Sequence, residues 1–465
     1  IPTAITFHDG GVIVQQAPQT LFLKDTDGDD VADVREVLFE GWSQYDTHAG
    51  PSNIHYGLDN WIWGVLGYSG FKGTVGGEQH EFRMGVYRFK QDGSKLEFLR
   101  RTNNNTWGLG FNEQGGPFIS TANGNPSTYQ PFPKRLYDLL PDMPDPVTES
   151  ISATARMIPL DNEFRQVDWV GAYTAGSGHG IYTARAYPKE YWNRIGFVAE
   201  PTGHLVGEFK LEEKGSSYQA SHPRNLIASD DQWFSPVVAE VGPDGNVWIA
   251  DWYNYVIQHN AESDRQKPTP GNAYANPLRD RKHGRIYRIV YEGAPEPDVK
   301  TLAGASPEKL VETLRDDNML WRKHAQRLLV ERGKTDVVPA LIKLVEDRSV
   351  DEIGLNVGAI HALWTLHGLG QLDGQNAEAL AAAKSALKHP SAGVRQNAVQ
   401  VLPKEQVAQA ILDAGLLQDA HAQVRLAALV ALAEAPASNE AGRGIFALLQ
   451  QQENMQDQWI REAAT

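Results

Sequence analysis

The spacing of hydrophobic residues changes about two thirds of the way along this chain of 465 residues. Before about residue 300, short apolar and aromatic runs are separated by Gly, Asn, Asp and Pro, which is typical of β-strands joined by turns. After that point, Ala- and Leu-rich segments carry apolar residues at helical spacing. We therefore predict a β-rich domain over 1–292, a linker over 293–308 and an all-α domain over 309–465.

Tight turns between strand-like runs recur along the β-rich region. Asp-Gly and Asp-Asn turns flanked by apolar residues are typical of β-hairpins. Such turns lie in FHDGGVIV (7–14), YGLDNWIWGV (56–65), GFNEQGGPFIS (110–120), VGPDGNVWIADW (241–252) and, less clearly, YPKEYWNRIGFVAE (187–200). Most intervals are roughly 50 residues, within the range of β-propeller blades. An antiparallel sandwich also contains such hairpins, but an array of this length favours a propeller of five or six blades. With six blades, the first is incomplete and its missing strands precede Ile1.

A four-residue pattern, Arg-x-x-Ala, recurs in the helical region. Its members are Arg322/Ala325, Arg395/Ala398, Arg425/Ala428 and Arg461/Ala464, and Ala359 replaces the Arg in GAIHALWTL (358–366). A period of roughly 30–37 residues with helical apolar spacing is typical of a HEAT-like α-solenoid. We expect the small Ala to let paired helices approach, and the Arg to pair with carboxylates at helix ends or in neighbouring repeats. Because the chain stops inside a repeat, we expect further sequence after Thr465.

The stretch KDTDGDDVAD (24–33) has the spacing of a calcium-binding loop. Counted from Asp25, carboxylates fall at the first, third, fifth and ninth positions, and Glu36 falls at the twelfth. The candidate oxygen ligands are Asp25, Asp27, Asp29, the Val31 carbonyl, Asp33 and Glu36. Asp30 stands where an EF-hand has Gly, and the flanking residues resemble strands. We therefore predict a Ca²⁺ loop between propeller strands, with a solvated acidic turn as the alternative.

Several polar residues lie next to predicted strands, where a propeller turns side chains toward its central channel. His48 just precedes a strand and is our candidate general base, with a structural histidine as the alternative. Asn104 and Asn105 hold the equivalent place in the next blade, where amides orient a ligand or close a turn. Further candidates are Asn123, Asn125, His179, Glu200, Asp251 and His259. The histidines lack the spacing of a local zinc motif, and no Ser/His/Asp triad, P-loop or dinucleotide fingerprint is present.

Charge and composition limit the classes of binding partner that we expect. The formal net charge of −15 disfavours nucleic acid and anionic lipid, and favours a cation, a neutral ligand or a basic protein. The absence of cysteine excludes disulfides, thiolate metal sites and covalent c-type haem in this chain. No apolar run reaches the ~18–20 residues that span a bilayer. The start, IPTAITF, has neither an initiator Met nor a signal pattern, so we expect a mature form or a fragment.

At these segments the sequence resembles a family of bacterial membrane-bound dehydrogenases. The stretches that carry the resemblance are FLKDTDGDDVADVREVLF, NNTWGLGF, YPKEYWNRIGFVAEPTGHLV, ASDDQWFSP, VGPDGNVWIADWYNYVIQH and HGRIYRIVY, spread over roughly residues 1–435. Members of that family combine a propeller with HEAT repeats and often a C-terminal cytochrome c. The resemblance implies an exported protein, periplasmic or at the cell surface, that passes electrons to a cytochrome domain or partner.

The propeller is also similar, more distantly, to the soluble quinoprotein sugar dehydrogenases. These use pyrroloquinoline quinone, calcium and a catalytic His, and the resemblance puts His48 in the place of that His and Asn105 in the slot of the Asn of their RNP motif. It assigns ligand positioning to Asn104, Asn123, Asn125, His179 and Asp251. Two departures concern the cofactor, since Asn104 replaces the Arg of that motif and Ser235 stands where many relatives have Arg. A tricarboxylate quinone needs such cationic partners.

Two functions are consistent with these observations. The first is a quinone-dependent sugar or polyol dehydrogenase with His48 as base and an electron acceptor outside this chain. The second is a non-catalytic scaffold whose propeller binds glycan or protein and whose solenoid docks a partner. A lyase or hydrolase that uses His48 and His179 is a third, weaker possibility.

Overall fold

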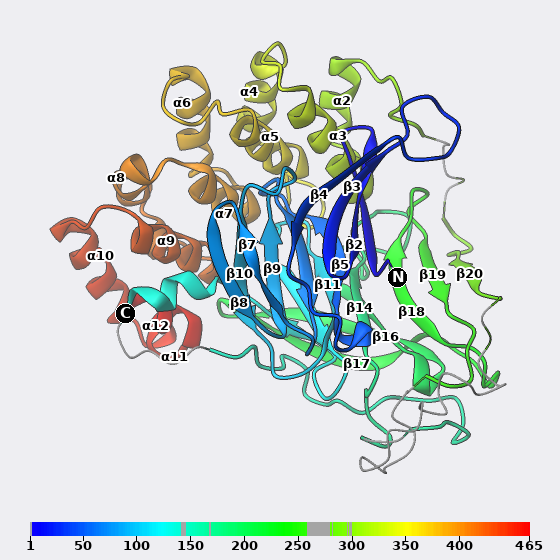
Figure 1. Ribbon diagram of the computed structural model, residues 1–465. Coiled ribbons are helices and arrows are strands. Elements are labelled where there is room, and N and C mark those ends of the chain that lie inside the picture. Colours follow the sequence, from blue (N-terminus) through cyan, green and yellow to red (C-terminus); the bar gives the residue numbers. More distant parts are fainter. Residues whose placement is uncertain are drawn as a thin grey trace.

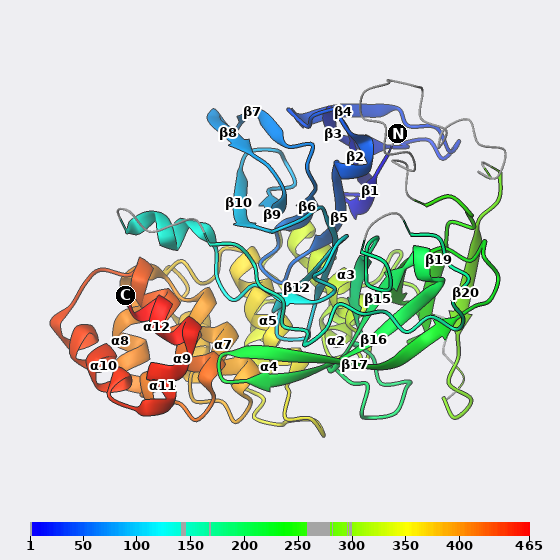
Figure 2. The same cartoon turned by 90° about the horizontal axis from the view of Figure 1, so that it is seen from below.

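The described part of the chain is a row of antiparallel sheets followed by an arc of helices (Figures 1 and 2). A computed structural model describes residues 2–140, 146–166, 169–257, 280, 282–294, 296 and 300–465. Among these residues, the last described strand ends at Ile289, and α2 begins at Pro307. His259, one of the polar candidates, and parts of the predicted linker lie outside the described residues.

Five larger sheets follow one another along the chain. The first contains β1 (Ala4–His8), β2 (Gly11–Gln16), β3 (Gln19–Lys24) and β4 (Val34–Glu40). The second contains β5 (Pro51–Tyr56), β6 (Ile62–Leu66), β9 (Gly85–Phe89) and β10 (Leu96–Arg101), and a hairpin of β7 (Phe71–Val75) and β8 (Glu78–Phe82) extends from it. The third contains β11 (Thr106–Phe111), β12 (Pro117–Thr121) and β13 (Thr128–Tyr129). The fourth contains β14 (Ser177–Ile181), β15 (Ile195–Glu200), β16 (Leu205–Lys214) and β17 (Ser217–Ala228). The fifth contains β18 (Pro236–Val241), β19 (Val247–Asp251) and β20 (Arg285–Ile289).

The hairpins expected from the turn patterns are confirmed. Strand β1 pairs with β2, β5 with β6, β11 with β12, β14 with β15 and β18 with β19, all antiparallel. In the first turn, Asp9 and Gly10 have φ of 41° and 69°, and positive φ at both central residues is the requirement of a type I′ hairpin. The Asp-Gly sequence therefore specifies this connection through its backbone.

The first strands of neighbouring sheets lie side by side, in the order β1, β5, β11, β14 and β18. Their spacing depends on glycine. A Cβ at Gly110 would lie 1.8 Å from the carbonyl oxygen of His179, and one at Gly180 would lie 2.2 Å from that of Ala239. Since real Cβ atoms never approach so closely, glycine lets these backbones meet. This is a propeller-like arrangement of sheets around a common axis.

Eleven described α-helices follow the sheets and form two rows. They are α2 (Pro307–Thr313), α3 (Met319–Arg332), α4 (Val338–Glu346), α5 (Val357–Gly368), α6 (Ala377–Ala386), α7 (Ala392–Val401), α8 (Lys404–Ala414), α9 (Ala422–Glu434), α10 (Asn439–Leu449), α11 (Gln452–Gln456) and α12 (Gln458–Ala464). Short 3₁₀ segments occupy η1 (Thr47–Ala49), η2 (Lys134–Leu139), η3 (Pro201–Gly203) and η4 (Leu416–Gln418). Helices α3, α5, α7 and α9 contact one another in turn and make the inner row.

Three of the four Arg-x-x-Ala pairs fall on this inner row, whereas Arg461/Ala464 lies in α12, where Arg461 is exposed. Ala325, Ala398 and Ala428 are fully buried where the helices pack. Arg395 donates to both carboxylate oxygens of Asp419, and Arg425 donates to Glu453, so the expected pairing with carboxylates of the following helices is confirmed. Each arginine also donates to a carbonyl six residues earlier in the chain, at His389 and Asp419 respectively. Arg395 and Arg425 therefore tie their helices to the turn before them and to a carboxylate further along the chain, whereas Arg322 donates to Glu113 of the β-rich region.

Helix α3 lies across the far ends of the five first strands. Its residues bond to the chain just beyond each strand, through the pairs Glu331–His8, Gln326–Leu58, Arg322–Glu113, Met319–Thr183 and Asn318–Gly242. The Arg322 and Glu113 side chains are both completely buried. A single hydrophobic core accordingly contains residues of both regions, among them Leu109, Phe111 and Leu329.

Candidate functional site

A cavity of about 730 Å³ lies on the axis that the five first strands share. Residues of β1, β5, β11, β14 and β18 form its walls, and α3 forms its floor. Aromatic side chains line much of it, among them Phe7, Trp107, Phe111 and Trp248. A few polar groups converge among these apolar ones, which is the usual composition of a ligand pocket.

Two polar side chains face each other at the floor end of the cavity. His55 Nε2 lies 3.5 Å from Glu240 Oε1, so β5 and β18 meet there through their side chains. Burial lowers the pKa of His55, and the nearby Glu240 only partly offsets this effect. At neutral pH His55 is therefore a neutral imidazole that can donate or accept one hydrogen bond.

Lys323 enters the same end of the cavity from α3. Its ammonium nitrogen lies 5.5 Å from the centroid of the Phe111 ring. Burial lowers the pKa of Lys323 to about 8, although Glu240 and Asp59 favour the charged form. At pH 7 the cavity floor therefore carries a desolvated positive charge.

The opposite part of the cavity is shaped by an irregularity in β5. The pairing of β5 with β6 shifts register between Ser52 and His55, and Asn53 has a φ of 53°. Asn53 Nδ2 donates to the Trp107 carbonyl at 2.9 Å and so joins β5 to β11. Bulges of this kind redirect side chains next to functional sites. Here the bulge places Ser52, Asn53 and Trp107 on the wall of the cavity.

The residues selected from the sequence gather at the face opposite α3, because they precede first strands or end second strands. His48 Nδ1 lies 3.3 Å from Asp46 Oδ1, and the His48 side chain is 35% exposed. Asn104 accepts a hydrogen bond from the Tyr68 hydroxyl at 2.9 Å. Asn105 Oδ1 is buried against Gly67 and accepts no hydrogen bond from any described residue. Since Ala49 also packs on Gly67, His48 and Asn105 belong to one neighbourhood.

Two further asparagines of this face close turns. Asn123 Oδ1 accepts a hydrogen bond from the Thr174 hydroxyl at 3.1 Å, which joins the third sheet to the fourth. Asn125 is buried, and its carbonyl accepts a hydrogen bond from the Thr121 backbone nitrogen. These contacts fit the turn-closing alternative for such amides.

Two buried carboxylates occupy equivalent places, at the ends of β15 and β19. Glu200 accepts hydrogen bonds from the backbone nitrogens of Thr174 and Ala175 at 2.8 and 3.0 Å. Asp251 Oδ1 accepts from those of Ser235 and Tyr253, both at 2.7 Å, whereas its Oδ2 is buried without a partner among the described residues. Each carboxylate thus holds the loop that leads into the first strand of its own sheet.

His179 lies between sheets rather than on the cavity. Its ring is completely buried, stacks on Phe118 at a centroid distance of 5.7 Å, and shares a hydrogen bond of 2.8 Å with Ser127. Burial lowers its pKa to about 4, so this imidazole stays neutral at physiological pH. Its surroundings are those of a packed core residue.

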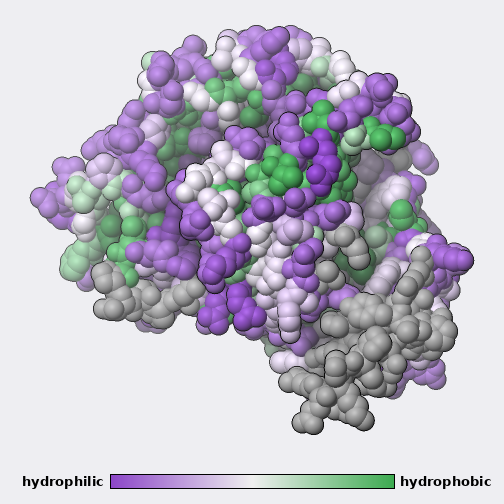
Figure 3. Space-filling model, in the orientation of Figure 1, coloured by the Kyte–Doolittle hydropathy of each residue, from purple (hydrophilic) through white to green (hydrophobic). Residues whose placement is uncertain are grey.

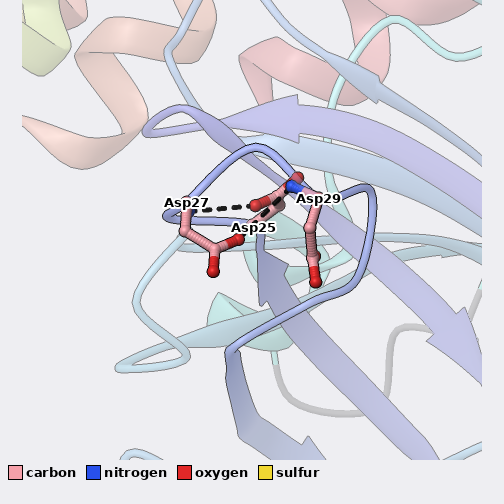
Figure 4. A group of neighbouring side chains, drawn as sticks. All are labelled: Asp25, Asp27 and Asp29. Atoms are coloured by element: carbon pink, nitrogen blue, oxygen red, sulfur yellow. Dashed lines mark hydrogen bonds between the residues drawn. The ribbon is translucent and has the colours of Figure 1, made fainter.

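The aspartate loop joins β3 to β4, between strands as expected from its flanking residues (Figure 4). Carboxylate oxygens of Asp25, Asp27 and Asp29 lie within 4.8 Å of one another. Asp25 accepts backbone hydrogen bonds from Gly28 at 2.7 Å and from Asp30 at 2.9 Å, and these lower its pKa. The remaining candidates stand apart from this group: Val31 is 64% exposed, Asp33 accepts from Thr26, and Glu36 lies in β4 opposite Phe22.

The cavity residues were largely missed by the sequence reasoning. His55 directly follows the buried Ile54, and Glu240 directly follows the buried Ala239. A polar residue next to an apolar one inside a predicted strand is a signal that could have identified them. Lys323 carries no such signal, because it lies in a helix more than 80 positions after the last of those strands. Only the packing of α3 across the strand ends brings it to the cavity.

Comparison with known protein families shows the family to which the chain belongs. The family described as "Domain of unknown function (DUF7133)" matches residues 1–293. The chain belongs to this family. The match covers the whole row of sheets and ends before α2. No curated protein matches the sequence.

Several solved structures resemble part of this DUF7133 chain at low sequence identity and low TM-score. The PQQ-bound aldose sugar dehydrogenase of Streptomyces coelicolor is 13% identical with a TM-score of 0.33, and the match covers 53% of this chain and 70% of that one. The soluble aldose sugar dehydrogenase of Escherichia coli, in its apo form, is 11% identical with a TM-score of 0.32, covering 53% and 72%. A luciferin-regenerating enzyme is 11% identical with a TM-score of 0.38, covering 64% and 80%. Likenesses this weak support no conclusion about the activity of this chain.

Within the described residues of this DUF7133 chain, no helix is both long and apolar enough to cross a membrane.

Proposed function

We propose that the central cavity of this protein binds a small carbohydrate. The observation that carries the proposal is the lining, in which aromatic faces lie beside a few converging polar groups. Trp107 and Phe111 offer flat apolar surfaces for the C–H face of a sugar ring. Asn53, His55 and Glu240 offer hydrogen-bond partners for its hydroxyl groups.

Replacing Trp107 by Leu tests this proposal. Loss of the aromatic face is expected to weaken binding of a monosaccharide about fivefold, because stacking on the ring contributes about 1 kcal/mol beyond the area buried. Titration calorimetry with glucose, galactose and glucuronate measures the change. The matched control is Trp61→Leu, whose indole lies outside the cavity beneath Arg88 and Lys90 and which should leave binding unaltered. If none of the three sugars binds the native protein, the proposal fails.

The second candidate function is that of a sugar or polyol dehydrogenase, and the pair of His48 and Asp46 favours this function. A carboxylate 3.3 Å from an imidazole nitrogen orients the ring and supports its action as a general base. Asn105 lies nearby with a buried acceptor oxygen that has no partner among the described residues. This reaction would need a two-electron acceptor, such as a quinone, to take the hydride while His48 takes the proton. The electrons would then pass to a cytochrome c domain or partner outside this chain.

The residues at this face do not fit pyrroloquinoline quinone. A tricarboxylate needs several cationic partners, whereas the buried charges here are the carboxylates of Glu200 and Asp251. Ser235, in place of an arginine, donates its backbone nitrogen to Asp251 and its hydroxyl to the Asn254 carbonyl. Absorbance after incubation with pyrroloquinoline quinone and Ca²⁺, followed by desalting, tests the fit. A retained quinone spectrum would support the dehydrogenase.

The proposal includes a complete propeller and a HEAT-like solenoid, with the domains divided at 292 and 309. Large apolar side chains are exposed on the free faces of the first and fifth sheets, among them Ile5, Phe7 and Ile286, at 64, 60 and 74%. Figure 3 shows apolar surface beside the hollow between these sheets. A sixth sheet would cover both faces and close the open side of the cavity. The solenoid would dock a protein partner, in the periplasm or at the cell surface of a bacterium.

Calcium at the β3–β4 loop is the structural part of the proposal. Bound Ca²⁺ would neutralise the mutual repulsion of Asp25, Asp27 and Asp29 and crosslink the loop. Native protein is expected to melt at a higher temperature with millimolar Ca²⁺ than with chelator, and the variant Asp27→Ala/Asp29→Ala is expected to lose this difference. Asp161→Ala, in another exposed loop, is the control. An equal calcium response in the variant and the native protein would contradict the assignment.

A further inference from the structure

We propose that the carbohydrate of the central cavity is an acidic sugar, whose carboxylate binds Lys323 at the cavity floor. This inference rests on the proposed carbohydrate binding and names the class of ligand. Its basis is the lack of a direct ion pair for Lys323 among the described residues, together with the position of α3.

The ammonium group of Lys323 has no ionic partner in the described structure. None of the described carboxylates lies within 4.0 Å of its Nζ, and the ring contact that it makes is with Phe111, at 5.5 Å. A lysine held against an aromatic wall loses water without gaining a compensating bond. Such a group is satisfied when an anion enters the cavity.

The acidic groups near Lys323 lie more than 4.0 Å from its ammonium nitrogen and contact other side chains. Asp59 lies 2.6 Å from Arg88 Nη1 and accepts hydrogen bonds from the Trp63 indole nitrogen. Glu240 faces His55 at 3.5 Å across the cavity. Neither carboxylate is placed to neutralise Lys323 directly.

The other basic groups of the floor are neutral or paired. Arg327 donates to both carboxylate oxygens of Glu331, at 3.0 and 2.8 Å. Burial lowers the pKa of His324 to about 4, and it lowers the pKa of His55 as well. Lys323 is therefore the basic group of the floor that lacks a direct ion pair among the described residues, and Glu240 faces the same end of the cavity as a hydrogen-bond acceptor. One ligand carboxylate can pair with Lys323 there.

The floor is rigid enough to hold such a ligand in one orientation. Helix α3 is bonded to the ends of all five first strands, so Lys323 lies at a fixed place below the aromatic walls. With the carboxylate on Lys323, the sugar ring would lie beside Phe111 and within the part of the cavity that holds His55 and Glu240. Hydroxyl groups can then donate to Glu240, which a second carboxylate could not do.

The experiment compares glucuronate with glucose, which share a ring and differ in a carboxylate. Calorimetry on the native protein is expected to show glucuronate binding at least tenfold more tightly than glucose, with an advantage that shrinks as NaCl is raised. Lys323→Met keeps the length of the side chain and removes the charge. This variant should weaken the binding of glucuronate at least tenfold and change the affinity for glucose by less than threefold. Lys343→Met, on the exposed side of α4, is the matched control.

The outcomes distinguish failure of the acidic-sugar inference from failure of the proposed carbohydrate binding. Equal binding of glucose and glucuronate to the native protein overturns the acidic-sugar inference and leaves carbohydrate binding in place, and this comparison needs no variant to fold. An equal loss of affinity for both sugars in Lys323→Met also overturns the acidic-sugar inference. Failure of both sugars to bind overturns the two proposals together. Tight binding of hexanoate in place of glucuronate would show a carboxylate site that is not selective for sugars, against the inference.

Discussion

Replacing Arg322 by Met is expected to destabilise the protein by about 3–5 kcal/mol, because it leaves a buried carboxylate without its principal partner. Arg322 and Glu113 are both fully buried, and Arg322 Nη2 donates to Glu113 Oε1. Arg185 alone, which donates to Glu113 at 2.8 Å, would then balance that charge. Urea unfolding followed by circular dichroism measures the loss of unfolding free energy.

Two further variants isolate the origin of that loss. The double variant Arg322→Met/Glu113→Gln removes both charges and should lose less stability than the sum of the single variants. Arg332→Met, at the end of the same helix, breaks a partly exposed pair with Asp336 of the following turn and should cost less than about 1 kcal/mol. A loss below about 1 kcal/mol for Arg322→Met would show that α3 is not held to the sheets through this pair.

Glu200 is expected to make stability fall as pH rises through neutrality. Burial raises the pKa of Glu200 from 4.5 to about 7. Between these two values the folded protein binds a proton that the unfolded chain releases. The contribution of this group is therefore largest below pH 4.5 and declines toward pH 7, by roughly 3 kcal/mol.

Unfolding free energies of the native protein and Glu200→Gln, measured from pH 4.5 to 8, test this prediction. The difference between the two proteins should shift in favour of the variant as pH rises, because Gln stays neutral. Glu212→Gln, at an exposed position, should run parallel to the native protein. Parallel curves for Glu200→Gln would mean that the backbone donors of Thr174 and Ala175 keep Glu200 ionised.

Local signals in the sequence anticipated the secondary structure well. Asp9 and Gly10 specify a hairpin through backbone conformations that few residues adopt, and the Arg395 and Ala398 pattern identifies packed helices through steric size and charge. Both signals depend on residues a few positions apart, so they can be recognised from the sequence alone. The division into domains stays a prediction, and the two regions share one core.

The candidate site was only partly accessible from the sequence. Position next to a strand brought His48 and Asn105 to one face, as expected from propeller geometry. The same rule selected His179, whose ring turned out to be packed against Phe118. Position along a strand predicts the end of a sheet at which a residue lies, but the side chain can still point into the core or toward the axis.

By itself, the sequence determined the order of strands and helices, the aspartate loop between two strands and the repeat that stacks the helices. These features depend on neighbouring residues, whose conformational preferences and spacing are written in the chain. Only the tertiary structure decided that α3 closes the end of the cavity and brings Lys323 opposite His55 and Glu240. That arrangement joins residues more than 80 positions apart, and it arises because buried groups such as Glu113 and Arg322 must find partners across the interface.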